Sequence, residues 1–124
     1  MDEVPEAGAA LGRLDEVVVD CADPPALARF WAALLGGEPV DRDPGWSYVD
    51  PPGGQPRIAF QAVPEPRGGH KNRLHLDIEV TDIVTVRGRL VRLGAQAVGE
   101  LRSDAQGQFQ VMRDPEGNEF CLVR

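Results

Sequence analysis

The most regular pattern in the chain is an alternation of apolar and polar side chains over residues 72–82. Aliphatic side chains, Leu74 among them, point to one side, and His75, Asp77 and Glu79 point to the other. A period of two is typical of a strand with one face on a hydrophobic core. Leu74 is therefore predicted to cover the core, and the imidazole next to it to point away. A strand whose polar face simply meets water fits the same pattern.

Helical spacing of apolar side chains occurs twice. The first stretch follows Asp23, an N-cap with proline after it, and ends at Gly36. Its apolar stripe contains Trp31, which we interpret as a core residue. The second stretch follows Asp82 and ends at Gly94. Both segments are predicted to be amphipathic helices that cover a sheet.

Seven further segments are short, extended and bounded by turn residues, which is typical of strands. They are 14–21, 38–40, 46–49, 57–63, 95–101, 108–113 and 119–123. Residues 64–71 are rich in proline and glycine and are predicted to form a loop. Residues 1–12 are small, acidic and interrupted by proline and glycine, so we expect a loose N-terminal leader.

The two halves of the chain repeat each other. Glu16 lies seven residues before the first helix cap, Asp23, and His75 lies seven residues before the second cap, Asp82. Each half reads strand, helix, then three strands. The sequence therefore predicts one α+β domain over 13–124, built from two βαβββ modules at about 13–63 and 73–124. Their sheets are expected to form a curved, half-barrel-like mixed surface with the helices outside.

Strand parity then selects the side chains that face away from the helices. Glu16, Gln61, His75 and Cys121 are predicted to face the hollow of the curved sheet. One β-bulge would reverse any of these assignments, because it shifts the alternation by one residue.

Composition narrows the classes of function. The chain has 124 residues, 42% hydrophobic and 27% charged, with a net charge of −7. An acidic chain without a basic stripe argues against nucleic acid or an anionic membrane as partner. No apolar run reaches the roughly 18 residues of a spanning helix, so we expect a cytoplasmic protein. The two cysteines are far apart in sequence and suggest no disulfide framework.

At its most specific motifs the sequence resembles the vicinal oxygen chelate superfamily, which includes glyoxalase I, bleomycin-resistance proteins, fosfomycin-resistance enzymes and extradiol dioxygenases. The similarity covers residues 13–124 and looks closest to small bacterial glyoxalase-like domains. It rests on Asp23-Pro24, Phe30-Trp31, Leu34-Leu35-Gly36, His75-Leu76-Asp77 and Asp114-Pro115-Glu116-Gly117-Asn118-Glu119-Phe120-Cys121. The resemblance implies paired βαβββ modules, a small-molecule ligand and often a homodimer.

The resemblance also implies a divalent metal in some members, with ligands on the first and last strands of each module. Glu16, His75 and Cys121 stand at such positions, and Gln61 stands near the fourth. The metal enzymes of the superfamily usually carry a carboxylate where this chain has Cys121. A cysteine is more often a small buried hydrophobe, so we expect the metal to be absent.

Three functions remain open. In a glyoxalase-type lyase, isomerase or transferase, the metal would polarise substrate oxygens. In a metal-free binding or antibiotic-resistance protein, Trp46 and Tyr48 would line an aromatic pocket. In metal-free acid/base catalysis, His75 would act with Asp77 or Glu79.

Overall fold

The computed structural model describes residues 8, 10, 13–66, 68 and 74–124. The predicted leader lies outside the described residues apart from positions 8 and 10. Residue 67 and residues 69–73 also lie outside the described residues. They include the end of the predicted loop and the start of the alternating segment.

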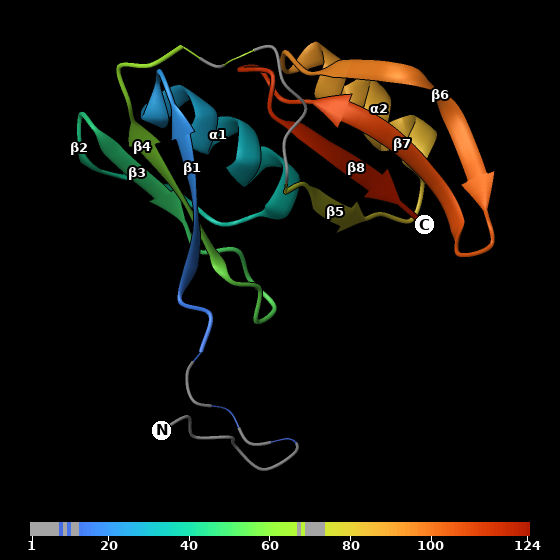
Figure 1. Cartoon of the computed structure of the whole chain (residues 1–124), viewed down its shortest axis with the longest axis horizontal. Coiled ribbons are helices and arrows are strands. Elements are labelled where there is room, and N and C mark those ends of the chain that lie inside the picture. The colour runs from blue at the N-terminus through green and yellow to red at the C-terminus, as the bar shows by residue number, and fades with distance from the viewer. Residues whose placement is uncertain (1–7, 9, 11–12, 67, 69–73) are drawn as a thin grey trace, which may run out of the picture.

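The repeated order of strand, helix and three strands is confirmed (Figure 1). The first module contains β1 (Glu16–Cys21), α1 (Pro24–Leu35), β2 (Pro39–Asp43), β3 (Trp46–Val49) and β4 (Arg57–Ala62). The second module contains β5 (Leu76–Glu79), α2 (Ile83–Arg92), β6 (Gln96–Asp104), β7 (Gly107–Arg113) and β8 (Glu119–Val123).

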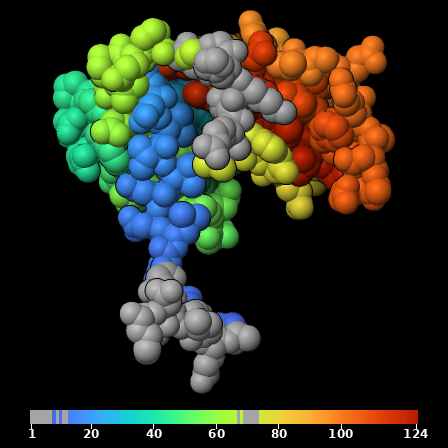
Figure 2. All heavy atoms as spheres, viewed as in Figure 1, coloured from blue at the N-terminus to red at the C-terminus, as the bar shows by residue number. Residues whose placement is uncertain are grey.

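Each module has its own four-stranded mixed sheet. The first sheet, sheet A, has the order β1-β4-β3-β2, and the second, sheet B, has the order β5-β8-β7-β6. In each sheet the first and last strands of the module are parallel, and the other pairs are antiparallel. Figure 2 shows the two modules as two lobes, blue to green and yellow to red. The predicted α+β class with paired modules is confirmed, and the sheets do not close into a barrel.

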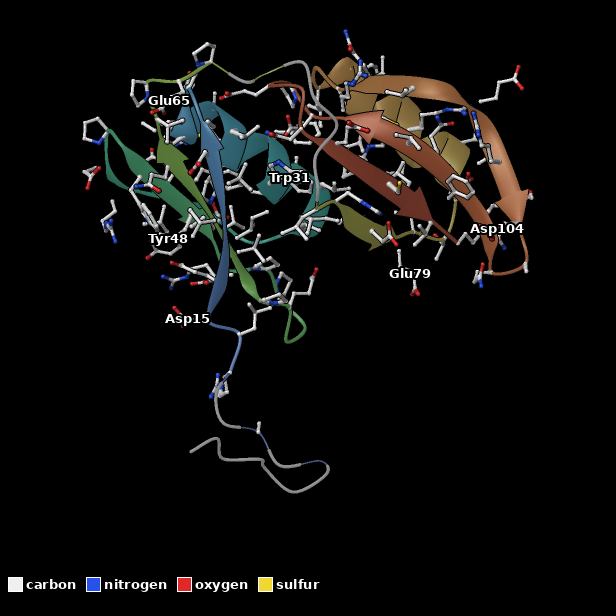
Figure 3. All side chains as sticks on the ribbon, in the orientation of Figure 1. Asp15, Trp31, Tyr48, Glu65, Glu79 and Asp104 are labelled. Atoms are coloured by element: carbon white, nitrogen blue, oxygen red, sulfur yellow. The ribbon has the colours of Figure 1, made fainter. Side chains whose placement is uncertain are left out.

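Helix α1 lies between the two sheets and joins them. Its start is fixed by Asp23, whose carboxylate accepts a hydrogen bond from the backbone N–H of Ala26 at 3.2 Å. Trp31 packs edge-on against Phe120 of β8, with ring centroids 5.0 Å apart. Edge-to-face aromatic pairs contribute about 1 kcal/mol beyond the area that they bury. Figure 3 labels Trp31 on α1, between the two sheets.

The turn before β8 makes a second contact between the modules, at the start of α1. The carboxylate of Glu116 accepts hydrogen bonds from the backbone N–H groups of Ala22, at 2.7 Å, and Asp23, at 2.9 Å. These donors lie at the N-terminal end of α1, where backbone N–H groups lack partners within the helix. The relative position of the modules is therefore set by contacts between side chains of one module and α1 of the other.

Several predicted boundaries were wrong. Strand β5 begins at Leu76, so His75 lies just before it, and Leu74 is 86% exposed instead of covering the core. The pairing of β5 with β8 begins only at Leu76 opposite Phe120, so the core has no surface for Leu74 to cover. Strands β2 and β6 also extend further toward their C-terminal ends than predicted.

Within the described part of the chain, no helix has the length and apolar character needed to cross a membrane. The cytoplasmic location expected from the sequence stays a prediction.

Candidate functional site

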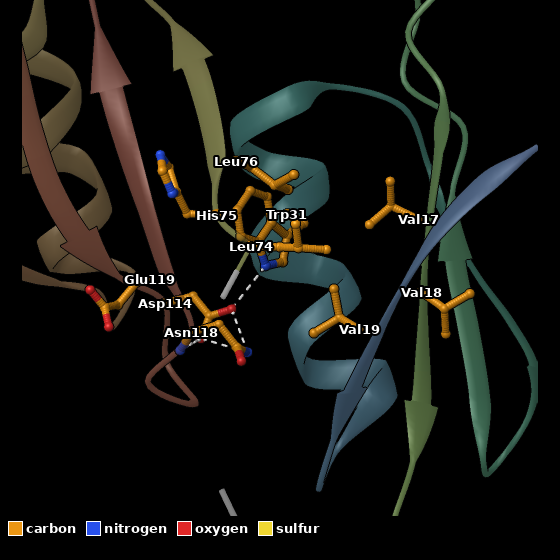
Figure 4. Close-up of a pocket in the computed structure, with 10 residues that line it drawn as sticks. All are labelled: Val17, Val18, Val19, Trp31, Leu74, His75, Leu76, Asp114, Asn118 and Glu119. Atoms are coloured by element: carbon orange, nitrogen blue, oxygen red, sulfur yellow. Dashed lines mark hydrogen bonds between the residues drawn. The ribbon is translucent and has the colours of Figure 1, made fainter. Parts of the chain in front are cut away.

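A slot of about 500 Å³ opens between the two modules, where the edge strands β1 and β5 face each other. Figure 4 shows its floor formed by Trp31 of α1, with β1 on one side and the start of β5 on the other. The turn before β8 closes one end. The lining residues are Val17, Val18, Val19, Trp31, Leu74, His75, Leu76, Asp114, Asn118 and Glu119.

The walls of the slot are apolar because β1 and β5 turn their core-facing side chains toward it. Val17 pairs with Ile58, and Val19 with Phe60, so both valines lie on the face of sheet A that forms the core. Leu76 occupies the same kind of position in sheet B. The slot is thus an extension of the core that the two sheets leave incompletely filled.

Asp114 forms the most completely bonded polar group of the slot. It is only 2% exposed. One oxygen accepts from the indole Nε1 of Trp31 at 3.1 Å, and the other accepts from the backbone N–H groups of Glu116 and Asn118, both at 2.9 Å. The side-chain amide of Asn118 donates to both oxygens. These bonds compensate for burial of the carboxylate and fix the indole ring that forms the floor.

Three side chains with ligand chemistry meet on the face of sheet B that points away from the core. Nε2 of His75 lies 3.4 Å from Oδ1 of Asp77, and Asp77 stands directly opposite Cys121 in the pairing of β5 with β8. The imidazole nitrogen, carboxylate oxygen and thiol sulfur all lie within 4.8 Å of one another. A nitrogen, oxygen and sulfur donor set suits a zinc-type ion, so the residues present fit the class of cofactor that the resemblance implies.

Glu16 and Gln61 lie elsewhere. Both belong to sheet A, and neither is a member of the group formed by His75, Asp77 and Cys121. The strand register also shows which residue of module one corresponds to Cys121. In sheet B, Asp77 pairs with Cys121. In sheet A, the residue equivalent to Asp77 is Val18, which pairs with Ala59. Ala59 therefore corresponds to Cys121, and Gln61 lies two positions further along β4.

Trp46 and Tyr48 lie on the face of sheet A that points away from the core. The guanidinium of Arg42 stacks over the Trp46 ring, 4.6 Å from its centroid. That of Arg57 lies 3.8 Å from the centroid of Tyr48 and also pairs with Asp50 at 2.7 Å. Both rings are covered by cations of the same sheet, which is a surface arrangement rather than an aromatic pocket. The pair of carboxylate and guanidinium lowers the pKa of Asp50.

A second, acidic hollow of about 510 Å³ lies at the end of β1 and contains Cys21 and Glu116. Burial, and then the nearby carboxylates with Glu116 first, raise the pKa of the Cys21 thiol to about 12. Because the thiolate is the reactive form of cysteine, the raised pKa and the burial of Cys21 both disfavour its reaction at neutral pH.

Reasoning from the sequence missed most of the slot. Trp31 was interpreted as a core residue, which it also is, Asp114 was interpreted as part of a turn, and Val17 was assigned to no site. The motif itself held a usable signal: an aspartate followed four residues later by asparagine is a compact turn that can bury its carboxylate. No pattern within one segment could show that this turn meets Trp31, 83 positions away in the chain.

Comparison with known proteins agrees with the architecture of paired βαβββ modules. The sequence profile of the Glyoxalase-like domain family matches residues 16–123. Since this match spans nearly the whole described fold, the chain belongs to the glyoxalase-like family within the vicinal oxygen chelate superfamily. No curated protein matches the chain in sequence.

Solved structures support the same fold. A glyoxalase/bleomycin resistance protein/dioxygenase family enzyme from Burkholderia phytofirmans PsJN superposes with a TM-score of 0.73, at 19% identity over 87% of this chain and 94% of that one. A glyoxalase-related enzyme from Fulvimarina pelagi gives 0.71, at 20% identity over 91% and 88%. A glyoxylase/bleomycin resistance protein/dioxygenase domain from Frankia sp. EAN1pec gives 0.69, at 16% identity over 92% and 98%. At these identities the likeness shows the fold alone.

Proposed function

We propose that this glyoxalase-like protein binds a compact, largely apolar small molecule in the slot between β1 and β5. The observation that carries the proposal is the slot itself, about 500 Å³ in volume with an indole floor and valine walls. Small-molecule sites commonly have volumes of roughly 300–1,000 Å³, mostly apolar walls and a few placed polar groups.

The polar end of the ligand belongs near His75, which lines the slot beside its apolar walls. Asp114 and Asn118 also line it, but they are hydrogen-bonded to each other and to the protein. The half-exposed imidazole of His75 can donate or accept a hydrogen bond. A ligand with one oxygen-rich end and an apolar body fits this distribution.

Two kinds of activity fit such a site. A lyase, isomerase or transferase would use His75, oriented by the neighbouring Asp77, to move a proton. A metal held beside His75 would add polarisation of a ligand oxygen. The second candidate is metal-free binding of an antibiotic-type molecule, favoured by the apolar walls of the slot. In that case the valines of β1 supply most of the contact surface, in place of the predicted Trp46 and Tyr48, because Trp31 at the floor is only 2% exposed. Turnover of a bound compound separates the two.

The proposal is tested by narrowing the slot. Val17 lines it without belonging to the buried core cluster, so Val17→Phe should block ligand binding at little cost in stability. Val40→Phe, on exposed β2, is the matched control. Compounds from a panel of small aromatic and aliphatic acids that raise the melting temperature of the wild type should raise that of Val40→Phe equally. If Val17→Phe responds like the wild type, the ligand does not use the slot.

We further propose that the protein is a homodimer. Exposed aliphatic side chains on both modules support this: Val18, Val40, Leu74, Val84, Val91 and Leu93 are all more than 40% exposed. Apolar surface of this kind is a common basis for self-association. Light scattering at micromolar concentration should give twice the chain mass, and a monomer mass would contradict the proposal.

A further inference from the structure

We propose that His75, Asp77 and Cys121 bind a thiophilic divalent cation of the zinc class by themselves, without Glu16 or Gln61. The geometry points to this set because the ligand atoms of these three side chains already lie within 4.8 Å of one another. The sequence alone suggested Glu16 as a ligand and the absence of a metal. Asp77 changes that expectation, because it supplies the third donor from within sheet B.

The backbone places the three donors on one side of sheet B. Asp77 and Cys121 are direct partners across the parallel pair of β5 and β8, and His75 lies two residues before Asp77 on the same face. The opposite face is anchored by Phe120 and Leu122, both fully buried. Two of the three donors thus stand on packed strands, and His75 directly precedes one of these strands, which favours a preformed site.

The donor set determines the class of ion. Zinc binds thiolate at about 2.3 Å and imidazole nitrogen or carboxylate oxygen at about 2.0–2.2 Å, so tetrahedral donors lie roughly 3.3–3.7 Å apart. The observed separations, which reach at most 4.8 Å, require a contraction of roughly 1.5 Å at most. Magnesium and calcium prefer oxygen donors alone and are disfavoured by the sulfur of Cys121. Three protein donors leave a fourth position open, as in zinc sites that bind water or substrate.

The repeat supplies an internal comparison. The residues of module one that correspond to His75, Asp77 and Cys121 by strand register are Glu16, Val18 and Ala59. Two of these three cannot bind a metal, so only module two can assemble the set. Glu16→Gln is therefore the matched control, since it removes a carboxylate at the equivalent place in the other sheet.

Cobalt(II) is the probe, because it replaces zinc and gives a charge-transfer absorption only when a thiolate is bound. Apo-protein titrated with cobalt should develop this band with one ion per chain. Cys121→Ser should abolish the band, and Asp77→Asn and His75→Gln should weaken binding by roughly tenfold or more. Glu16→Gln should match the wild type. Absence of the band in wild-type protein would overturn the proposal. So would a loss of affinity in Glu16→Gln equal to that in Asp77→Asn.

Thiol alkylation provides a second readout that does not depend on cobalt spectra. Zinc should slow the alkylation of Cys121, which is partly exposed, while the buried Cys21 stays unreactive with or without zinc. Equal alkylation of Cys121 in both conditions would contradict a thiolate ligand. His75 belongs to both the slot and the donor set, but Val17 supplies no donor. Val17→Phe should therefore retain cobalt even where it has lost the small molecule.

Discussion

The two modules share one order of strands and helix, but their helices have different roles. In α1 the side chains of Leu27, Phe30 and Trp31 are at most 5% exposed, whereas α2 leaves Val84 54% and Val91 47% exposed. Figure 1 shows the reason: α1 lies between the two sheets, whereas α2 packs against sheet B. A repeated topology therefore does not imply repeated burial, because only one helix can occupy the position between the modules.

The two modules also differ in the kinds of side chains that they supply. Module one supplies the indole and valines of the slot, and its open face holds aromatic rings already covered by arginines. Module two supplies His75, Asp77 and Cys121, whose side chains meet on one face of sheet B.

Substitutions that test the difference between the two helices should have the largest effect, and this effect is on stability. Trp31→Ala removes a buried ring that contacts Phe30 and Phe120, and should lower the free energy of unfolding by about 4 kcal/mol. Val84→Ala, on the exposed side of α2, should change it by less than about 0.5 kcal/mol. Urea denaturation measures both. Similar losses in the two variants would show that the helices do not differ in role.

Removing the buried carboxylate should have the next largest effect. Asp114→Ala leaves the indole N–H of Trp31 and the backbone N–H groups of Glu116 and Asn118 without their acceptor. We expect a loss of about 3 kcal/mol in unfolding free energy. Replacing the exposed Asp15 with alanine should leave stability nearly unchanged. If Asp114→Ala is equally neutral, the turn before β8 does not hold the modules together.

The smallest effect concerns pH. The pKa of Cys21 is raised from 9.0 to about 12 in the folded protein, so the unfolded chain loses this proton first. The protonated thiol contributes its full stabilisation below about pH 9, and that contribution is lost as pH rises toward 12. Between about pH 8 and about pH 10.5, the wild type should lose more stability than Cys21→Ala does. Parallel slopes in denaturation experiments would show that burial does not hold the proton on this thiol.

The sequence predicted the fold well because the signals for it are local. Helix caps at Asp23 and Asp82, and the alternation around His75, each lie within one segment. The site was only partly predictable. Strand parity indicated the face on which Cys121 lies. It did not indicate that the pairing of β5 with β8 starts only at Leu76, which leaves Leu74 exposed at the rim of the slot. Contacts between modules carry no local signal.

The separation between Gln61 and Ala59 illustrates the same limit. Counting from the helix caps aligns the first strands of the modules, because that spacing is identical in both halves. The last strands follow loops of different length, so their alignment depends on hydrogen-bond register, which the sequence does not encode within one segment. Asp77 appeared in the sequence as a polar neighbour of His75, and only the pairing with β8 made it a partner of Cys121.

The central claim, that a small molecule binds in the slot between β1 and β5, can be tested directly by nuclear magnetic resonance. The chain contains two tryptophans, and therefore two indole N–H signals. That of Trp31 lies at the floor of the slot, and that of Trp46 lies on the outer face of sheet A under Arg42. A bound small aromatic or aliphatic acid should shift the Trp31 signal and leave the Trp46 signal in place. A shift of Trp46 alone, with Trp31 unchanged at saturating ligand, would contradict the account.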